Sequence, residues 1–354
     1  MYADNKTKIN YMKKHGTNQE PLPKLDFNVT NRCNFRCIHC CFRSGETLLD
    51  EFSIEKIKEV LRNFKELGGQ RIDVTGGEPL MRKDIAEIIK IGKKIGLKIE
   101  LVTNASLLTD RKLKLFKKLG LDAVAISLDG SSYKIYRKIR PVSRETYSKI
   151  VSNIKKCVKL GFYTKVNTVV FNSNLDDLVN INELCIKWEV NEHGFYYFTP
   201  VGRGTANLSE VVDPSKWLKI IRSDLYKRKD KIKLSIETPV LESNLTKNLN
   251  IFCYLKNPWH LQILPDGNVY PCAIMAFYNK PCGNLYSQTL KEIWYDKKLW
   301  DSTYYRKNIL PLLKKFGSCV YFNKTFKQLI RNRKFKFICP MCKYKTEDLY
   351  EKTQ

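Results

Sequence analysis

Residues 30–41 read TNRCNFRCIHCC and place three thiols, those of Cys33, Cys37 and Cys40, at C-x3-C-x2-C spacing. Thiolates are soft ligands that favour iron–sulfur clusters, zinc or Cu(I). Three ligands so close in sequence can hold one cluster from a single loop and leave its fourth corner without a protein ligand. The spacing therefore predicts a metal centre that keeps one position open for chemistry.

The same cysteines also fit a zinc loop. A structural zinc site takes four ligands, and His39 or Cys41 stands next to Cys40 and could supply the fourth. The spacing favours an iron–sulfur cluster over zinc, but it leaves both open.

Length and composition predict a cytoplasmic protein with two domains. The 354 residues exceed the roughly 250–300 at which a single core stops growing, so a large domain with a smaller one is expected. The sequence contains neither an apolar run of about 18 residues nor the apolar stretch of a secretory signal. In a reducing compartment the twelve cysteines are metal ligands or packed thiols and not disulfides.

The net charge of +27 does not by itself indicate a nucleic-acid partner. Lysine is spread over nearly every predicted helix and forms no single block, which is typical of a generally basic surface. An anionic substrate, such as an acidic peptide or a carboxylated ring, is compatible with this surface.

Short β patterns alternate with amphipathic helical patterns from residue 25 to about residue 198, which predicts an α/β fold with a parallel sheet. The expected strands are 25–29, 71–75, 98–103, 122–128, 164–170 and 194–198. The expected helices are 54–67, 84–95, 110–119, 144–160 and 175–188. Periodicity does not decide whether this sheet closes, stays open or forms a partial barrel.

Polar or glycine-rich segments follow each of the first four predicted strands. They are the cysteine loop, Gly76-Gly77-Glu78-Pro79, Asn104 and Asp129-Gly130. In parallel α/β architectures the carboxyl ends of the strands meet on one rim, so these segments are expected to converge there. Paired glycines lack Cβ atoms and let the backbone approach a ligand. The Glu78 carboxylate could form an ion pair with a cationic group of that ligand.

These segments together resemble the radical S-adenosylmethionine (SAM) superfamily, in its SPASM/twitch branch. The matching segments are the cysteine loop, GGEPL at 76–80, Asn104 and SLDG at 127–130. The resemblance implies a partial (β/α)6 barrel with a [4Fe-4S] cluster on Cys33, Cys37 and Cys40. The methionyl group of SAM would chelate the unique iron of that cluster. A ferredoxin or flavodoxin would supply the electron that cleaves SAM to a 5′-deoxyadenosyl radical, which abstracts hydrogen from a substrate.

The resemblance also implies residues that contact SAM. The segment of Thr75, Gly76, Gly77 and Glu78 would hold the methionyl amino group, Asn104, Ser127 and Asp129 would contact the ribose or methionyl end, and Arg140 would face the carboxylate. His39 stands where the family often has an aromatic residue near the adenine, and an imidazole can still stack there. Pro141 replaces the glycine that usually follows the arginine.

A second group of cysteines lies in the last third of the chain. Pro265-Asp266-Gly267 predicts a hairpin turn between Cys253 and Cys272. Cys339 and Cys342 add a C-x2-C pair, so the four thiols fit a zinc ribbon as well as a cluster.

The spacing from Cys253 through Gly267 to Cys272, followed by Gly283-Asn284-Leu285, resembles the opening of the SPASM/twitch motif. This implies one auxiliary [4Fe-4S] cluster on the four cysteines of the second group, which are Cys253, Cys272, Cys339 and Cys342. The resemblance thus gives a domain order of an extension (1–23), the barrel (24–204), a helical linker (205–250) and an auxiliary-cluster domain (251–354). Pro200-Val201-Gly202-Arg203-Gly204 resembles the family's exit from the barrel and equally fits an ordinary glycine-rich linker.

Five cysteines are left without a ligand role. Cys157 and Cys185 fall on amphipathic helical patterns and are predicted to be buried. Cys282 and Cys319 are candidate hydrogen-atom donors to a substrate radical, although packing explains a spare cysteine as well, and Cys319 could also replace a cluster ligand. Cys41 has no assigned role.

The expected function is a radical SAM enzyme that cross-links, epimerises or forms a thioether in a ribosomally made peptide. Only about two dozen residues precede the barrel, too few for the leader-binding domain that some peptide-modifying members carry, which weakens the peptide hypothesis. Maturation of a tetrapyrrole, haem or another cofactor is the alternative within the family. A zinc-stabilised nucleic-acid-binding protein is an alternative of another class, which leaves Gly76-Gly77-Glu78 unexplained.

Overall fold

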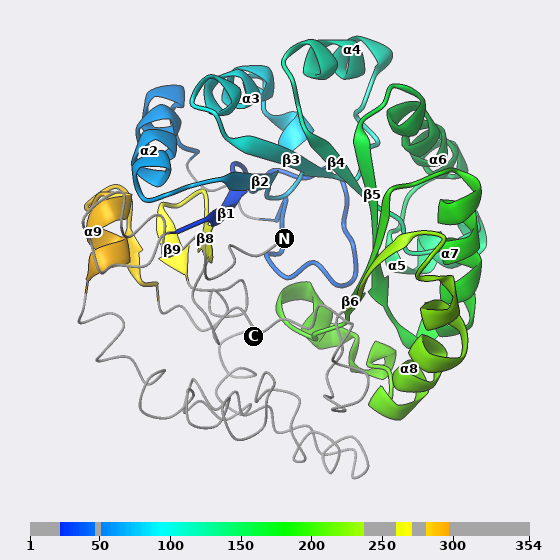
Figure 1. Ribbon diagram of the computed structural model, residues 1–354. Helices are drawn as coiled ribbons and strands as arrows, with labels where there is room; N and C mark the ends of the chain where they lie inside the picture. The colour runs from blue at the N-terminus through cyan, green and yellow to red at the C-terminus, as the bar shows by residue number, and fades with distance from the viewer. Residues whose placement is uncertain (1–21, 47–50, 237–259, 271–280, 297–354) are drawn as a thin grey trace.

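The computed structural model describes residues 22–46, 51–236, 260–270 and 281–296. Its strands form one curved sheet in the order β10-β9-β8-β1-β2-β3-β4-β5-β6-β7, with the helices on the outer face (Figure 1). The strands are β1 (Lys24–Asn28), β2 (Arg71–Thr75), β3 (Lys98–Thr103), β4 (Ala123–Ser127), β5 (Tyr163–Val170), β6 (Glu192–Tyr197), β7 (Lys233–Ile236), β8 (His260–Ile263), β9 (Asn268–Tyr270) and β10 (Gly283–Asn284).

The sheet is parallel from β8 through β1 to β7, and β9 and β10 are antiparallel additions. It does not close, because β7 and β10 stand at its two ends in the described part of the chain. The predicted partial barrel is therefore confirmed. All six predicted strands are present, with ends within two residues of those expected.

The helices of the described residues are α2 (Ile54–Glu66), α3 (Ile85–Lys94), α4 (Asp110–Lys118), α5 (Tyr133–Ile139), α6 (Arg144–Lys159), α7 (Leu178–Lys187), α8 (Pro214–Ile220) and α9 (Leu290–Tyr295). The five longest of them, α2, α3, α4, α6 and α7, follow the predicted amphipathic patterns. In α2, the Ser53 hydroxyl accepts the amide of Lys56 at the first turn, and Gly68, with φ at +85°, follows the last turn. None of the helices in the described ranges is long and apolar enough to cross a bilayer.

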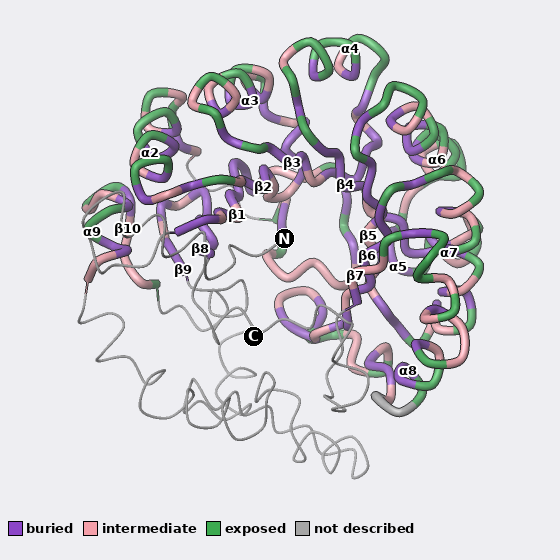
Figure 2. The backbone as a smooth tube through the Cα atoms, in the orientation of Figure 1, coloured by how far each residue is buried: buried purple, intermediate pink, exposed green. Residues whose placement is uncertain are grey.

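The α2 helix shows how these elements are held. Its buried stripe is Ile57, Val60, Leu61 and Phe64, which pack against the sheet. Burying one such side chain contributes roughly 1.5–3 kcal/mol. Buried residues lie along the strands and on part of each turn of the covering helices (Figure 2).

Two faces of the sheet can be told apart from one contact. A Cβ atom at Gly92 of α3 would lie 2.7 Å from Ile99 Cδ1, so Ile99 points to the helices. Alternation along β3 then turns Glu100 to the inner, concave face, and the register places Asp73 beside it. The concave face is therefore lined by charged side chains near the start of the strands.

These charges are paired across neighbouring strands. Lys24 bonds Asp26 and Asp73 at 2.8 Å each, and Arg71 bonds Asp73 at 2.7 Å and Glu100 at 2.8 Å.

A second set of ion pairs joins β5, β6 and β7. Glu192 accepts Lys165 at 3.2 Å and Lys233 at 2.6 Å. Burial alone would raise the pKa of Glu192, but the two ammonium groups outweigh it and lower the pKa to about 2. Asp26, Asp73, Glu100 and Glu192 are thus each paired with at least one cation.

The predicted Pro265-Asp266-Gly267 turn is confirmed, because β8 and β9 form an antiparallel pair around it. Gly267 has φ at +83° and donates its amide to the carbonyl of Leu264. The pairing of β8 with β1 was not predicted, and it joins a strand from the chain after residue 251 to the barrel sheet. Cys253, Cys272, Cys319, Cys339 and Cys342 lie outside the described residues.

Candidate functional site

The three thiols of the cluster loop, residues 30–46, each accept one N–H donor. The donor and acceptor pairs are Phe35 N to Cys33 Sγ at 3.4 Å, Ser44 N to Cys40 Sγ at 3.3 Å and Arg140 Nη1 to Cys37 Sγ at 3.4 Å. Donors aimed at sulfur stabilise a thiolate, which is the form that binds metal. The loop therefore presents three sulfurs in surroundings suited to ligation.

The chemistry of these thiols fits an iron–sulfur cluster. None of the three is in a disulfide, and burial raises the pKa of Cys33 to about 11 and also raises that of Cys37. The raised pKa values mean that iron must displace protons from Cys33 and Cys37 when it binds. Among the described residues, no three Cys, His, Asp or Glu side chains converge as ligands of a single ion. Cluster ligands need no such convergence, because each binds a different iron.

The segment after β6 clasps the cluster loop. Arg203 donates Nη1 to Cys37 O at 2.8 Å and Nη2 to Ser44 O at 3.1 Å, and its Nε bonds Glu46 at 2.7 Å. Its amide also donates to Cys40 O at 3.0 Å. The 200–204 segment is thus more than a linker.

A glycine makes this contact possible. A Cβ atom at Gly202 would lie 2.1 Å from the carbonyl oxygen of Cys41, and Gly202 has φ at +58°. Asn207 completes the clasp by donating Nδ2 to the carbonyl of Ile38 at 3.0 Å. The short 3-10 turn η3 (Gly202–Ala206) therefore brings the exit of the barrel directly onto the loop.

Arg203→Ala is expected to loosen the cluster loop and to speed the loss of its iron by about tenfold. The change removes two carbonyl contacts and a part-exposed ion pair, and a net loss of about 1.4 kcal/mol corresponds to that factor. The measurement is the rate of iron release to a chelator. Arg43→Ala is the control, because the Arg43 side chain also lies near Glu46, at 4.0 Å, but the carbonyls of Cys37 and Ser44 accept from the side chain of Arg203. Equal rates of iron release in the two variants would show that the contacts of Arg203 do not hold the cluster loop in place.

The glycine loop after β2 lies against the cluster loop. Gly77 donates its amide to Thr30 O at 2.8 Å, and Glu78 donates its amide to Arg32 O at 2.8 Å. A Cβ atom at Gly76 would lie 2.3 Å from Thr30 O, and one at Gly77 would lie 2.2 Å from Arg32 O. These glycines therefore allow two backbones to meet, and their contact with a bound ligand stays a prediction.

The Glu78 carboxylate is fully buried and faces the protein. It accepts Thr103 Oγ1 at 2.6 Å, the amide of Asn104 at 2.8 Å and the amide of Leu80 at 3.1 Å. Burial raises its pKa, while these donors favour the charged form. Glu78 thus fixes the end of β3, and its contact with a cationic group stays a prediction.

Asn104 connects the end of β3 to the cluster loop. Its Nδ2 donates to Asn34 Oδ1 at 3.0 Å, and Asn34 in turn donates to Ser106 Oγ at 2.9 Å. The predicted convergence of the strand ends is therefore present for the first three strands. Neither Asn34 nor Ser106 was predicted, because isolated polar residues in loops carry no periodic signal.

Arg140 and Asp129 form a buried ion pair at the ends of α5 and β4. Arg140 Nε donates to Asp129 Oδ2 at 2.5 Å, and Arg140 Nη2 lies 3.4 Å from His39 Nε2. Because a guanidinium only donates, His39 Nε2 is an acceptor and its proton sits on Nδ1. Burial and the charge of Arg140 lower the pKa of His39 to about 3, so the ring is neutral.

His39 also brings an unsatisfied donor to the site. Its ring lies 5.3 Å from that of Phe171, and its Nδ1 atom is buried without a hydrogen-bond partner in the described structure. A buried N–H without an acceptor is costly, and the described residues do not supply an acceptor for this one.

The remaining predicted residues lie as follows. Thr75 and Ser127 end β2 and β4 at the same rim and are partly exposed. Cys157 and Cys185 are fully buried, as predicted. Cys282 donates its amide to Val269 O at 2.6 Å and packs against the hydrophobic core, and its role as a hydrogen-atom donor stays a prediction.

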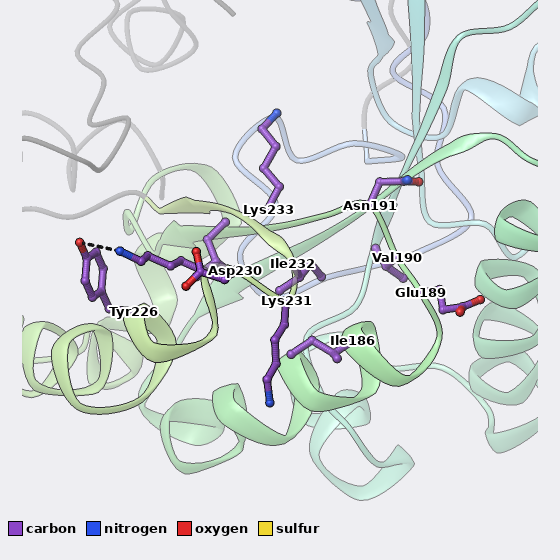
Figure 3. A pocket seen from close by; sticks show the side chains of 11 residues that line it. Ile186, Glu189, Val190, Asn191, Tyr226, Asp230, Lys231, Ile232 and Lys233 are labelled. Atoms are coloured by element: carbon purple, nitrogen blue, oxygen red, sulfur yellow. Dashed lines mark hydrogen bonds between the residues drawn. The ribbon is translucent and has the colours of Figure 1, made fainter.

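A separate cavity of about 630 Å³ lies between the end of α7 and the start of β7 (Figure 3). Its lining includes Lys229, Lys231 and Asp230, and Lys229 Nζ donates to Tyr226 OH at 3.3 Å. It opens beside the amino ends of the strands, whereas the cluster loop follows a carboxyl end. This cavity is therefore not part of the candidate site.

Two family models match the chain. The model described as the radical SAM superfamily matches residues 27–185, and the SPASM model, described as an iron-sulfur cluster-binding domain, matches residues 253–343. The chain belongs to the radical SAM superfamily, in its SPASM branch. As a radical SAM protein it is an enzyme, and its cofactors are [4Fe-4S] clusters and SAM. The hypothesis of a zinc-stabilised nucleic-acid-binding protein is accordingly set aside.

The curated relatives of this chain include enzymes with different names. The AdoMet-dependent heme synthase of Methanosarcina barkeri is 24% identical over 298 residues, which cover 76% of this chain and 81% of that protein. A probable GTP 3′,8-cyclase of Sulfurisphaera tokodaii is 31% identical over 215 residues, which cover 60% of this chain and 66% of that protein.

Solved structures confirm the fold of this radical SAM enzyme. Streptococcus suis SuiB bound to S-adenosylmethionine superposes with a TM-score of 0.70 at 19% identity, covering 94% of this chain and 81% of SuiB. The anSMEcpe protein with bound AdoMet gives a TM-score of 0.64 at 19% identity, covering 79% of this chain and 82% of that chain.

Proposed function

We propose that Cys33, Cys37 and Cys40 hold the [4Fe-4S] cluster that acts on SAM. The observation that carries this assignment is that each thiol accepts one N–H donor, two from backbone amides of the loop itself and one from the side chain of Arg140. When bound, the cluster supplies the electron that cleaves SAM and so yields a carbon radical able to take hydrogen from a substrate. The auxiliary cluster is proposed on Cys253, Cys272, Cys339 and Cys342.

The SAM site is proposed on the rim beside this loop. The proposed residues are Thr75, Gly76, Gly77, Glu78, Asn104, Ser127, Asp129, Arg140 and His39. Support comes from His39 Nδ1, a buried donor without a partner in the described residues, which would donate to an acceptor atom of the cofactor. Arg140 uses one N–H of each guanidinium nitrogen in its contacts with Asp129, Cys37 and His39, which leaves one N–H on each terminal nitrogen that could donate to the methionyl carboxylate.

The proposed substrate is a ribosomally made peptide, on which the enzyme forms a cross-link or thioether or inverts a residue. SuiB has been crystallised with its precursor peptide SuiA and anSMEcpe with the Cp18Cys peptide, and both share this fold. The charged groups of the described concave face also support a peptide. Arg71 and Lys165 are already paired with carboxylates, so these two cations are not free to bind a ring with several carboxylates.

Maturation of a tetrapyrrole is the second candidate. One observation favours it, namely that the match to the Methanosarcina barkeri heme synthase extends over 298 residues and covers 81% of that protein. Both candidates use the same proposed cluster and SAM site, so they differ only in what enters the barrel.

The deciding experiment compares substrates on protein purified without oxygen and supplied with SAM and a reductant. A short peptide encoded beside the gene is expected to raise 5′-deoxyadenosine formation above the substrate-free rate and to be modified, as seen by mass spectrometry. If only a carboxylated tetrapyrrole raises the rate, the peptide proposal fails.

A second experiment in D2O distinguishes epimerisation from cross-linking. Solvent deuterium in the modified peptide would identify epimerisation, and loss of that deuterium in Cys282→Ala or Cys319→Ala would identify the hydrogen donor.

A further inference from the structure

The donors to the three loop thiols differ in charge. Cys33 and Cys40 accept neutral backbone amides, whereas Cys37 accepts the guanidinium of Arg140. Cys37 is also the most buried of the three thiols, at 7% exposure. The positive charge is therefore next to the sulfur whose surroundings screen charge least.

This guanidinium is held in place by other contacts. Arg140 is 7% exposed, and Asp129, which accepts its Nε, is fully buried. Asp129 is fixed in turn by accepting the amide of Val169 at 2.8 Å through its other oxygen. The contact of Arg140 with Cys37 is thus built into the fold and does not depend on a bound cofactor.

A charge in this place acts on reduction of a cluster. The potential of an iron–sulfur cluster depends on the hydrogen bonds to its sulfurs and on nearby charge. Reduction adds one electron from the external reductant, so the reduced form carries one more negative charge. A cation 3.4 Å from a ligand sulfur stabilises that form, and the carboxylate of Asp129, bonded to the far side of the guanidinium, partly offsets it.

We propose that Arg140 raises the reduction potential of the cluster through its charged hydrogen bond to Cys37, and that Asp129 sets how far it does so. This role is separate from any contact of Arg140 with SAM, and it rests on the proposed cluster ligands. Arg140 acts here through its charge on a ligand sulfur and not on the substrate. The charges of Arg140 and Asp129 together set how readily the cluster takes up an electron.

The test is a redox titration of the protein without SAM. The titration is monitored by electron paramagnetic resonance, using the signal that is absent from Cys33→Ala and therefore belongs to the proposed cluster. Arg140→Gln is expected to lower the midpoint potential and Asp129→Asn to raise it. A purely structural role would not give opposite signs. Arg137→Gln is the control, because Arg137 lies exposed on the same helix over the ring of Tyr133 and is expected to leave the potential unchanged.

Other outcomes separate the two levels of the proposal. An unchanged potential in Arg140→Gln with weaker SAM binding would restrict Arg140 to the cofactor and overturn the inference, while the proposed function would stand. If no signal in the wild type depends on Cys33, the cluster assignment itself fails. Should Arg140→Gln not fold, the double variant Asp129→Asn/Arg140→Gln removes both buried charges. It is expected to titrate below the wild type, because the lost guanidinium lies nearer the sulfur, and a potential equal to the wild type would overturn the proposal.

Discussion

Cys33→Ala is expected to lose all measurable cleavage of SAM and to keep about half of the iron of the wild type. With two [4Fe-4S] clusters the chain holds about eight irons, and the variant keeps the roughly four of the auxiliary cluster. The reason is the ligand count. Only three protein thiols are proposed for the first cluster, so losing one leaves it with two. The measurements are iron content, visible absorption and 5′-deoxyadenosine formed from SAM.

Cys41→Ala is the matched control for this variant. Cys41 directly follows the third cysteine but lies outside the C-x3-C-x2-C spacing. Full iron content and full cleavage are expected in Cys41→Ala. Normal 5′-deoxyadenosine formation by Cys33→Ala would show that the ligand assignment is wrong, and a colourless wild type with stoichiometric zinc would overturn the cluster altogether.

Local pattern was sufficient to predict the six strands of the barrel and the longer helices. In α2, the stripe of apolar residues, the Ser53 cap and Gly68 all lie within one short segment, so each signal is visible in the sequence itself. The seven-residue helix α5 was missed, because it is too short to show two full turns of a stripe. The strand β7 was missed in a charged stretch, because pairing with β6 supplies its stability.

The pairing of β8 with β1 could not be predicted from periodicity. The hydrophobic pattern of β8 says which residues are buried, but the choice of partner depends on chain closure over more than two hundred residues. Gln262 of β8 donates to Asn28 of β1 at 2.7 Å, a contact between residues 234 positions apart. No motif in either strand indicates the other.

The candidate site shows the same limit. Spacing predicts the three thiols as ligands, and position after the strands predicts Asn104 and Asp129 as neighbours of the site. The bond from Arg203 to Cys37 O spans 166 positions, and that from Arg140 to Cys37 Sγ spans 103. The direction of a side chain at a strand end is also invisible in the sequence, which is why the contacts of Glu78 with Thr103 and Asn104 were not foreseen.

Gly77→Ala is expected to prevent the cluster loop from closing, with a cost of roughly 2–5 kcal/mol from backbone overlap and lost hydrogen bonds. An added Cβ atom would lie 2.2 Å from the carbonyl oxygen of Arg32 and 2.7 Å from its carbonyl carbon. Both are backbone atoms, so no rotamer change relieves the overlap. The loops must separate, and Cys33 directly follows Arg32 in the sequence.

Iron content and SAM affinity, measured together, separate the two interpretations of this glycine. If Gly77 serves only to admit the cofactor, Gly77→Ala keeps its iron and loses SAM affinity. If it lets the two loops meet, as the bond from Gly77 N to Thr30 O indicates, iron falls as well, and this is the expected result. Gly120→Ala is the control, because Gly120 has φ at +79° but its nearest contact is the flexible end of Lys93 at 3.6 Å. That variant bears only the backbone cost of about 1–2 kcal/mol, so equal iron content in the two variants would show that the contact between the loops does not position the cluster.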